Sequence, residues 1–258
     1  MRATNFEFRN RFWFICLTYF VGFGSYAFDH LNAGEALVRW MFSSRDPHLD
    51  SLAARHAIQG LFAISAMLVT AGAWIRTWGG AYLRSEVVHD SAVHTERLVA
   101  DGPYRHLRNP LYLGNMFLAV GMSLLASRTG GVVLILGNLL IVLRLIGREE
   151  AALMQAQGEG YRAFLAAVPR LWPSLRPRLP ASGLQPRWLQ AFLGEAWIWT
   201  FSINGFLFAW KLDGRLYNII LWVSGAAYFL MRIVLGRWRR RNSPPPAPEQ
   251  PSPPSSQL

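Results

Sequence analysis

The sequence predicts an all-α protein, a polytopic bundle of transmembrane helices with about six spans. First, 52% of the 258 residues are hydrophobic, and they gather in six blocks that contain no charged residue. Second, arginine and aromatic residues flank these blocks, which is the pattern of a membrane protein. The single cysteine, Cys16, excludes an internal disulfide framework.

The lengths of the blocks suggest how the chain crosses the bilayer. A span needs about 20 apolar residues, and roughly 17 can suffice. The first two blocks reach that length alone, whereas the other four need flanking residues. Only Ser127 and Arg128 separate the third block from the fourth, so we expect a tight helical hairpin there and a second hairpin at the end. The blocks are residues 12–28, 57–75, 111–126, 129–143, 196–210 and 216–231.

The basic residues predict the orientation. If the N-terminus is cytoplasmic, 20 of the 26 lysine and arginine residues fall in inner segments, as the positive-inside rule requires. We therefore expect an integral protein of a bacterial inner membrane with both termini in the cytoplasm, and we expect the first block to be a retained anchor rather than a cleaved signal peptide. Anionic lipid headgroups explain the net charge of +11 better than nucleic acid does.

This reading divides the chain into four parts. Residues 1–83 would hold the N-terminal transmembrane helices, and residues 84–180 a core with two long inner segments. Residues 181–242 would add a C-terminal transmembrane hairpin. Residues 243–258 are rich in proline and serine, so we expect a disordered tail.

The first inner segment, residues 84–112, ends in a cluster of unusual residues. A Gly-Pro pair at 102–103 marks a turn, and Pro110 suits the first turn of the following helix, where a missing N–H costs little. The N-terminus of that helix and the guanidinium of Arg108 both favour an anionic group such as a carboxylate. Tyr104 and Tyr112 could stack on a base or donate a hydrogen bond.

The second inner segment follows the fourth block. We expect an amphipathic interfacial helix that begins at Glu149 and Glu150 and ends before Pro169. A carboxylate there could bind hydroxyl or amino groups of a ligand. Acidic residues at a helix start are also ordinary complements of the helix dipole, and this alternative stays open. Tyr161 and Phe164 are expected to be packing residues.

These segments resemble a known family. The stretch GPYRHLRNPLYLG, followed after a hairpin by EEAALMQAQGEGYRAFLAAVPRLWP, is similar to the isoprenylcysteine carboxyl methyltransferase and phospholipid methyltransferase superfamily over about residues 97–173. Two positions depart from its pattern. Asn109 replaces a common histidine and removes a titrating group, and Phe164 replaces a common tyrosine and removes a hydroxyl.

The resemblance implies an enzyme that transfers a methyl group from S-adenosyl-L-methionine to a lipophilic acceptor, either a prenylcysteine-like carboxylate or a lipid headgroup. It places the methyltransferase core in residues 84–180, with membrane lipids as partners and no nucleic acid. The acceptor would reach the site laterally from the bilayer. Arg170 would lie at the rim or near the acceptor, and no catalytic residue is identified. The implied cofactor contacts are Tyr104, Arg108, Asn109, Pro110, Tyr112, Glu149 and Glu150.

Two alternatives remain at this stage. One is an NADPH-dependent membrane reductase with a sterol-reductase-like fold, although Leu111 stands where those enzymes have an asparagine. The other is a non-catalytic membrane scaffold. No metal site is expected, because His89, His94 and His106 lack the spacing of a ligand pair and suit a solvated loop. Glu195 is expected at the membrane interface, and the sequence makes no prediction of the oligomeric state.

Overall fold

The computed structural model describes residues 2–42, 51–83 and 100–242, without the side chains of residues 229, 232 and 235–242. Within these ranges every extended regular element is a helix, which confirms the all-α prediction. The predicted disordered tail, and the loop positions of His89 and His94, lie outside the described residues. The arginine run at 237–241 belongs to the last helix, but its side chains are likewise outside the description.

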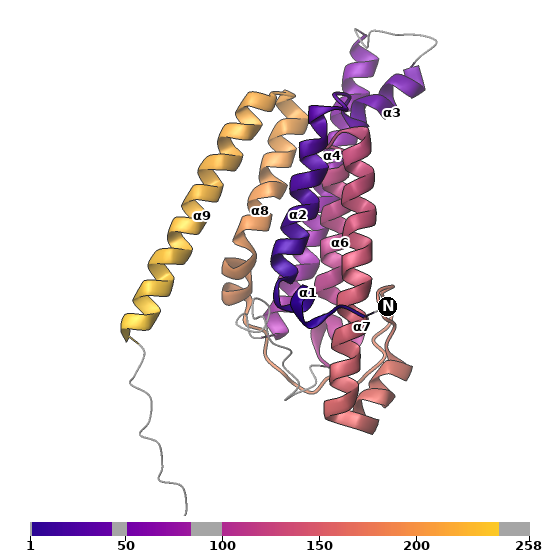
Figure 1. Cartoon of the computed structure of the whole chain (residues 1–258), viewed down its shortest axis with the longest axis vertical. Coiled ribbons are helices and arrows are strands. Elements are labelled where there is room, and N and C mark those ends of the chain that lie inside the picture. The colour runs from indigo at the N-terminus through magenta and orange to yellow at the C-terminus, as the bar shows by residue number, and fades with distance from the viewer. Residues whose placement is uncertain (1, 43–50, 84–99, 243–258) are drawn as a thin grey trace, which may run out of the picture.

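Long helices run side by side in the bundle, and each predicted apolar block overlaps one of them (Figure 1). Only α4 and α7 are long and apolar enough to qualify as spans by length and composition among the described residues. The six-span count therefore stays a prediction. The helices are α2 (Arg11–Gly24), α4 (Leu52–Tyr82), α6 (Pro110–Ser123), α7 (Arg128–Ala167), α8 (Trp188–Lys211) and α9 (Gly214–Asn242).

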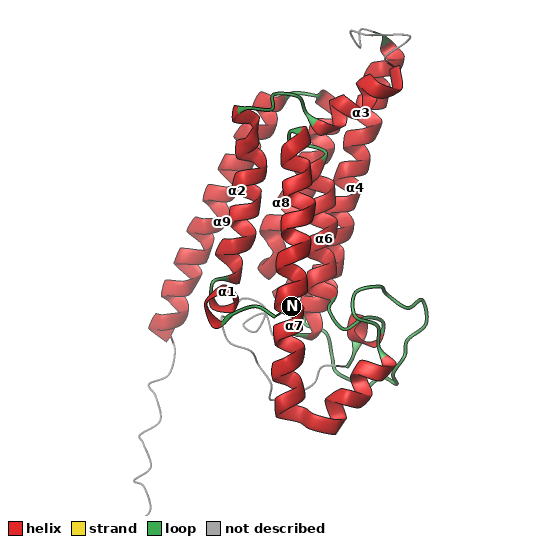
Figure 2. Cartoon of the chain, turned by 45° about the vertical axis from the view of Figure 1, so that its right-hand side comes forward, coloured by secondary structure: helices red, strands yellow, loops and turns green. Residues whose placement is uncertain are grey.

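Shorter helices cap the two ends of the bundle. The helix α1 (Asn5–Arg9) and the 3-10 turn η2 (Gly102–Arg105) lie at the same end as the bend of α7, which we call the inner end (Figures 1 and 2). The 3-10 turn η1 (Ser25–Ala27) and α3 (Ala33–Phe42), which the sequence did not predict, lie at the opposite end. The start of the chain and the end of α9 share the inner end.

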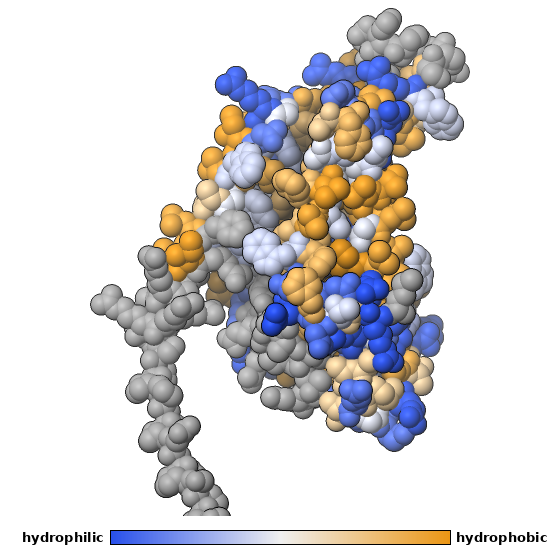
Figure 3. All heavy atoms as spheres, viewed as in Figure 1, coloured by the Kyte–Doolittle hydropathy of each residue, from blue (hydrophilic) through white to orange (hydrophobic). Residues whose placement is uncertain are grey.

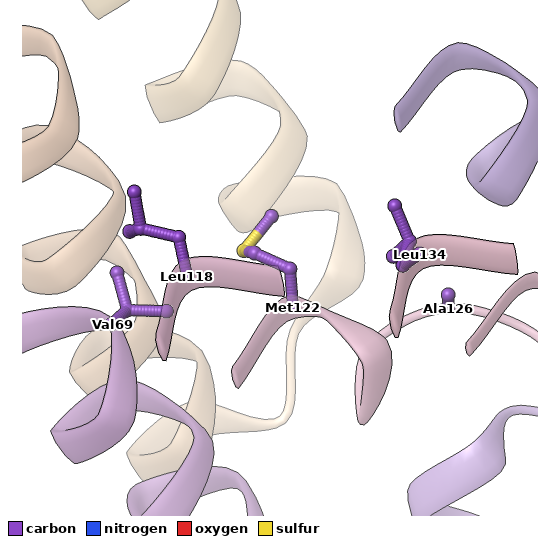
Figure 4. Close-up of a cluster of buried hydrophobic side chains, with 5 residues drawn as sticks. All are labelled: Val69, Leu118, Met122, Ala126 and Leu134. Atoms are coloured by element: carbon purple, nitrogen blue, oxygen red, sulfur yellow. The ribbon is translucent and has the colours of Figure 1, made fainter. Parts of the chain in front are cut away.

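Small residues and a buried apolar cluster hold the central helices together. A Cβ atom at Gly72 would lie 2.7 Å from the carbonyl oxygen of Gly114, so α4 and α6 approach as closely as their backbones allow. The cluster in Figure 4 joins α4, α6 and α7 through Val69, Met122 and Leu134, all buried. On the face drawn in Figure 3, apolar side chains cover the middle of the bundle and polar ones gather toward its ends, as is typical of a membrane protein.

The α6–α7 hairpin forms as predicted, but the helix expected to begin at Glu149 does not exist as a separate element. Instead α7 continues through Glu149 and Glu150 to Ala167. No proline or helix-breaking turn interrupts residues 144–157, and most of them are strong helix formers, so the helix has no reason to end. The direction changes at Gly158, where φ is 55° and ψ is −124°. The two glutamates therefore do not complement a helix dipole.

Glu195 is buried inside the bundle, and its predicted position at the level of the membrane interface stays a prediction. Its side chain is 4% exposed and forms a bidentate ion pair with Arg76, with both N–O distances 2.8 Å. Arg76, itself 11% exposed, also donates to Asn115 at 2.7 Å. This group ties α8 to α4 and α6. A buried charge needs partners, and the guanidinium of Arg76 finds them in the carboxylate of Glu195 on α8 and the amide oxygen of Asn115 on α6.

Substituting Glu195 by glutamine leaves the Arg76 charge buried without its counter-ion. We expect the free energy of unfolding to fall by about 3–5 kcal/mol, measured by SDS titration in mixed micelles with circular dichroism. Glu159 pairs with Arg162 on the surface, where the side chains are 80% and 67% exposed. Glu159→Gln is the control and should cost less than about 1 kcal/mol. Equal losses for the two variants would contradict this account of the buried pair.

Candidate functional site

The inner loop before α6 is built around a glycine that no other residue can replace without strain. Gly102 has a φ of 55°, and a Cβ atom there would lie 2.2 Å from the ring of Tyr82. The turn η2 that follows buries Tyr104, whose side chain is 7% exposed. The hydroxyl of Tyr104 is buried and has no hydrogen-bond partner among the described residues. It is therefore free to bond to a ligand.

The residues that directly follow α7 lie against the start of α6. The backbone N–H of Arg108 donates to the carbonyl of Pro169 at 2.9 Å, and the side-chain amide of Asn109 donates to the carbonyl of Arg170 at 3.0 Å. Asn109 is also the N-cap position of α6, which begins at the buried Pro110, as predicted. Asn109 thus has a structural role that needs no titrating group.

The carboxylate of Glu150 pairs with two arginines at the site, Arg108 and Arg170. One of its oxygens lies 3.2 Å from Arg108, and the other accepts a hydrogen bond from Arg170 at 2.6 Å. The side chains of Arg108 and Glu150 are 14% and 15% exposed. The Nε of Arg108 and the Oε1 of Glu150 are nevertheless buried without a hydrogen bond. Oε1, the oxygen that faces Arg108, therefore pairs with it by charge without a hydrogen bond, and the Nε of Arg108 keeps one unused donor.

Glu149 lies beside two tyrosines. The hydroxyl of Tyr112 donates to its Oε1 at 2.8 Å. Burial, and then the negative charge of Glu149, raise the pKa of Tyr104 well above the ordinary value of 10. Tyr104 therefore remains a neutral phenol, able to donate a hydrogen bond, over the physiological pH range.

The two stretches singled out from the sequence thus meet in space, although 36 residues or more separate them. The structure brings all eight predicted residues to the inner end, where η2, the start of α6 and α7 join. Their roles as contacts of a ligand stay predictions. The eight are Tyr104, Arg108, Asn109, Pro110, Tyr112, Glu149, Glu150 and Arg170.

Two arginines near this group were not predicted as site residues. Arg76 donates to the carbonyl of Leu111 at 3.4 Å in the first turn of α6. Arg11 lies within electrostatic reach of Glu149 and Tyr112. In the sequence both residues flank apolar blocks, as do arginines that only anchor a helix at the inner membrane surface. Only their contacts in the folded protein distinguish Arg76 and Arg11 from such anchors.

Residues 168–187 form a strap that crosses the inner loop. The guanidinium of Arg105 donates to the carbonyl of Leu179 at 2.7 Å, and a ring nitrogen of His106 lies 2.8 Å from the carbonyl of Ser174. His106 is therefore a half-buried packing contact, and the solvated role expected for it is wrong. Tyr161 and Phe164 are buried beneath the strap, as predicted for packing residues.

Comparison with known proteins shows that part of the chain matches a known family. Residues 61–158 match the phospholipid methyltransferase family, which belongs to the isoprenylcysteine carboxyl methyltransferase superfamily. The matched stretch runs from α4 through η2 and α6 to the bend of α7, and so includes seven of the eight site residues. No curated protein and no solved structure matches the chain.

The strap provides a prediction about pH. The buried Asp101 carboxylate accepts hydrogen bonds from the hydroxyl of Ser182 and the backbone N–H groups of Ser182 and Leu184. The Ser182 hydroxyl, followed by the Leu184 N–H, holds the pKa of Asp101 below the ordinary 3.8. The stabilisation is therefore complete above the ordinary pKa and is lost as the pH falls through the lowered value.

We expect Asp101→Asn to increase amide hydrogen exchange at Ser182 and Leu184 by roughly tenfold at pH 7, because a charged acceptor is lost. In the unsubstituted protein, protection of these amides relative to intrinsic rates should decline only below about pH 4. Asp213 also accepts hydrogen bonds from backbone N–H groups, but at the α8–α9 turn, away from the strap. Asp213→Asn is therefore the matched control and should leave exchange at Ser182 and Leu184 unchanged. If Asp101→Asn leaves both amides protected, the strap is held by other contacts.

Proposed function

Because residues 61–158 belong to the phospholipid methyltransferase family, we propose that this protein is an integral membrane enzyme that transfers a methyl group from S-adenosyl-L-methionine to a lipophilic acceptor. The observation that supports this most directly is the meeting of the two motif stretches. Arg108 pairs with Glu150, and Tyr112 bonds to Glu149, at the inner end of the bundle.

The groups at the site fit the methyl donor. S-adenosyl-L-methionine has a carboxylate, an amino group, ribose hydroxyls and an aromatic base. The Nε of Arg108, which has no hydrogen bond, matches the carboxylate, and the Oε1 of Glu150, which is paired with Arg108 by charge but accepts no hydrogen bond, matches the amino group or a hydroxyl. The unpartnered hydroxyl of Tyr104 is one further donor, on a ring that could pack against the base. Each buried polar atom left without a hydrogen bond here has a partner on the donor.

The residues of the chain would act mainly by orientation. When bound, S-adenosyl-L-methionine supplies an electrophilic methyl group on a positively charged sulfur. Arg108 and Glu150 would fix the amino acid part of the donor, while Tyr112 holds Glu149 in place. Correct alignment of an acceptor with the methyl–sulfur bond can contribute about 7–11 kcal/mol to the rate. A carboxylate acceptor needs no general base, so Asn109 in place of histidine is compatible with activity.

We also propose that the inner end faces the cytoplasm of a bacterial cell. The start of the chain and the end of α9 share this end, and the inner segments hold most of the arginines. The acceptor would enter laterally from the bilayer, since the site lies at the end of apolar helices. A reporter enzyme that is active only in the cytoplasm, fused to the C-terminus, tests the orientation and should be active. Methylation of water-soluble acceptors only would exclude the lateral route.

Isothermal titration tests the donor site directly. The full-length protein in lipid nanodiscs should bind S-adenosyl-L-methionine, and Glu150→Ala should weaken this binding by roughly 30-fold or more, because it removes a partly buried charged partner. Glu159 lies exposed on the same helix, so Glu159→Ala is the control and should bind normally. Binding of NADPH without S-adenosyl-L-methionine would instead support a reductase. Failure of both ligands to bind would support a non-catalytic scaffold.

A further inference from the structure

The buried Arg76–Glu195 ion pair lies beside the first turn of α6. The Nε and Nη2 atoms of Arg76 donate to the two carboxylate oxygens of Glu195 on α8, both at 2.8 Å. Its Nη1 donates to the side-chain oxygen of Asn115 at 2.7 Å and to the carbonyl of Leu111 at 3.4 Å, both on α6. The guanidinium therefore connects the Glu195 carboxylate to the turn that also carries Tyr112.

A glycine of α6 leaves the space through which Arg76 reaches this turn. A Cβ atom at Gly114 would lie 2.4 Å from the Cγ of Arg76 and 3.2 Å from its Cδ. Any larger residue at position 114 would therefore displace the arginine side chain from its contacts with α6. Arg76 and Gly114 both lie within the matched residues 61–158, whereas Glu195 lies outside them.

Other contacts already join α8 to α4. The indole N–H of Trp199 donates to the hydroxyl of Thr77 at 3.0 Å, and the hydroxyls of Ser202 and Thr70 form a hydrogen bond. A buried ion pair adds little stability to such an interface, because the desolvation of two charges offsets much of their attraction. Attachment of α8 alone therefore does not explain the buried carboxylate of Glu195.

The positive charge of Arg76 extends into the candidate site. It opposes the burial and the Glu149 charge that raise the pKa of Tyr104, and it also reaches Tyr112. The proposed methyl donor carries a positive charge on its sulfur, so an unneutralised guanidinium would repel it through an interior that screens charge weakly. Glu195 cancels the charge of Arg76 and still leaves its Nη1 directed at α6.

We propose that Glu195 is a positioning residue of the donor site, which holds Arg76 against the first turn of α6 and neutralises it. This inference rests on the proposed function and adds α8, outside the matched residues 61–158, to the elements that shape the site. Glu195 acts through Arg76. It would therefore determine how well the site distinguishes the cationic donor from S-adenosyl-L-homocysteine, which lacks the methyl group and has an uncharged sulfur.

Isothermal titration of the full-length protein in lipid nanodiscs compares the two ligands at a temperature where circular dichroism shows each variant folded. Glu195→Gln should raise the Kd of S-adenosyl-L-methionine about tenfold more than that of S-adenosyl-L-homocysteine, because the Arg76 charge then lacks its counter-ion. A residue that only held α8 in place would weaken both ligands equally. Equal changes for the two ligands, or no change, would overturn the proposal.

Trp199→Phe is the matched control for this titration. It removes a neighbouring α8–α4 hydrogen bond without touching Arg76, so the ratio of the two Kd values should stay that of the unsubstituted protein. If the ratio shifts in Trp199→Phe as it does in Glu195→Gln, the effect comes from looser packing of α8 and the charge account is wrong.

A double variant keeps the proposal testable if Glu195→Gln folds poorly. Arg76→Gln combined with Glu195→Gln removes both buried charges, so no unpaired ion remains in the bundle. The ratio of the two Kd values should then equal that of the unsubstituted protein. Both Kd values should nevertheless rise about fivefold, because no guanidinium holds the start of α6. Unchanged binding of both ligands would overturn the positioning role.

Hydrogen exchange separates this inference from the proposed function. The backbone N–H of Leu113 donates to the carbonyl of Asn109 at 3.0 Å in the first turn of α6. In ligand-free protein its exchange should increase roughly tenfold in the double variant and stay unchanged in Trp199→Phe. If the unsubstituted protein binds neither ligand, the proposed function fails, whereas this exchange still tests whether Arg76 orders the turn. Unchanged exchange of Leu113 in the double variant would contradict that role.

Discussion

The arrangement of the inner end depends on the ion pair between Arg108 and Glu150. Both side chains are about 85% buried, and each retains one polar atom without a hydrogen bond. Desolvating two charges is expensive, and hydrophobic residues of similar volume would often stabilise the protein more. The pair joins the end of the inner loop to the middle of α7, so it fixes the relative position of the two motif stretches. Its incomplete hydrogen bonding is explained if a ligand supplies the missing partners.

The length of α7 sets the distance of this site from the opposite end of the bundle. The helix begins at Arg128, and Glu149 follows 21 residues later, a rise of roughly 30 Å, which is about the thickness of the hydrocarbon core. The carboxylates therefore lie about one bilayer thickness from the start of α7 only because the helix continues without a break past residue 143. Gly158 then turns the chain back, so that Tyr161 and Phe164 pack beneath the strap. The part of α7 before Gly158 thus sets the distance of the acidic pair from Arg128, and the part after the kink closes the inner end.

Local signals in the sequence predicted a large part of this arrangement. The helices at the apolar blocks, the turn at Gly102 and the helix start at Pro110 each depend on a few neighbouring residues, and each is confirmed, whereas the crossing of a membrane by all six blocks stays a prediction. The helix start at Glu149 was wrong, because a charge pair after an apolar block resembles a helix N-terminus when the path of the backbone is unknown. The pairing of Arg76 with Glu195 joins residues 119 positions apart, and no local pattern indicates such a contact.

Segments outside the matched residues 61–158 supply polar partners for charged residues inside them. Arg76 and Arg148 both lie in residues 61–158, yet their main polar partners come from elsewhere. Glu195 on α8 neutralises Arg76, and the N-terminal segment supplies the oxygens that orient Arg148. An isolated matched segment would lack these partners for one buried and one half-buried cation, and the loss of a partner of a buried charge is destabilising. The flanking helices therefore belong to the same packed unit as the matched segment, because they supply polar partners of its charged residues.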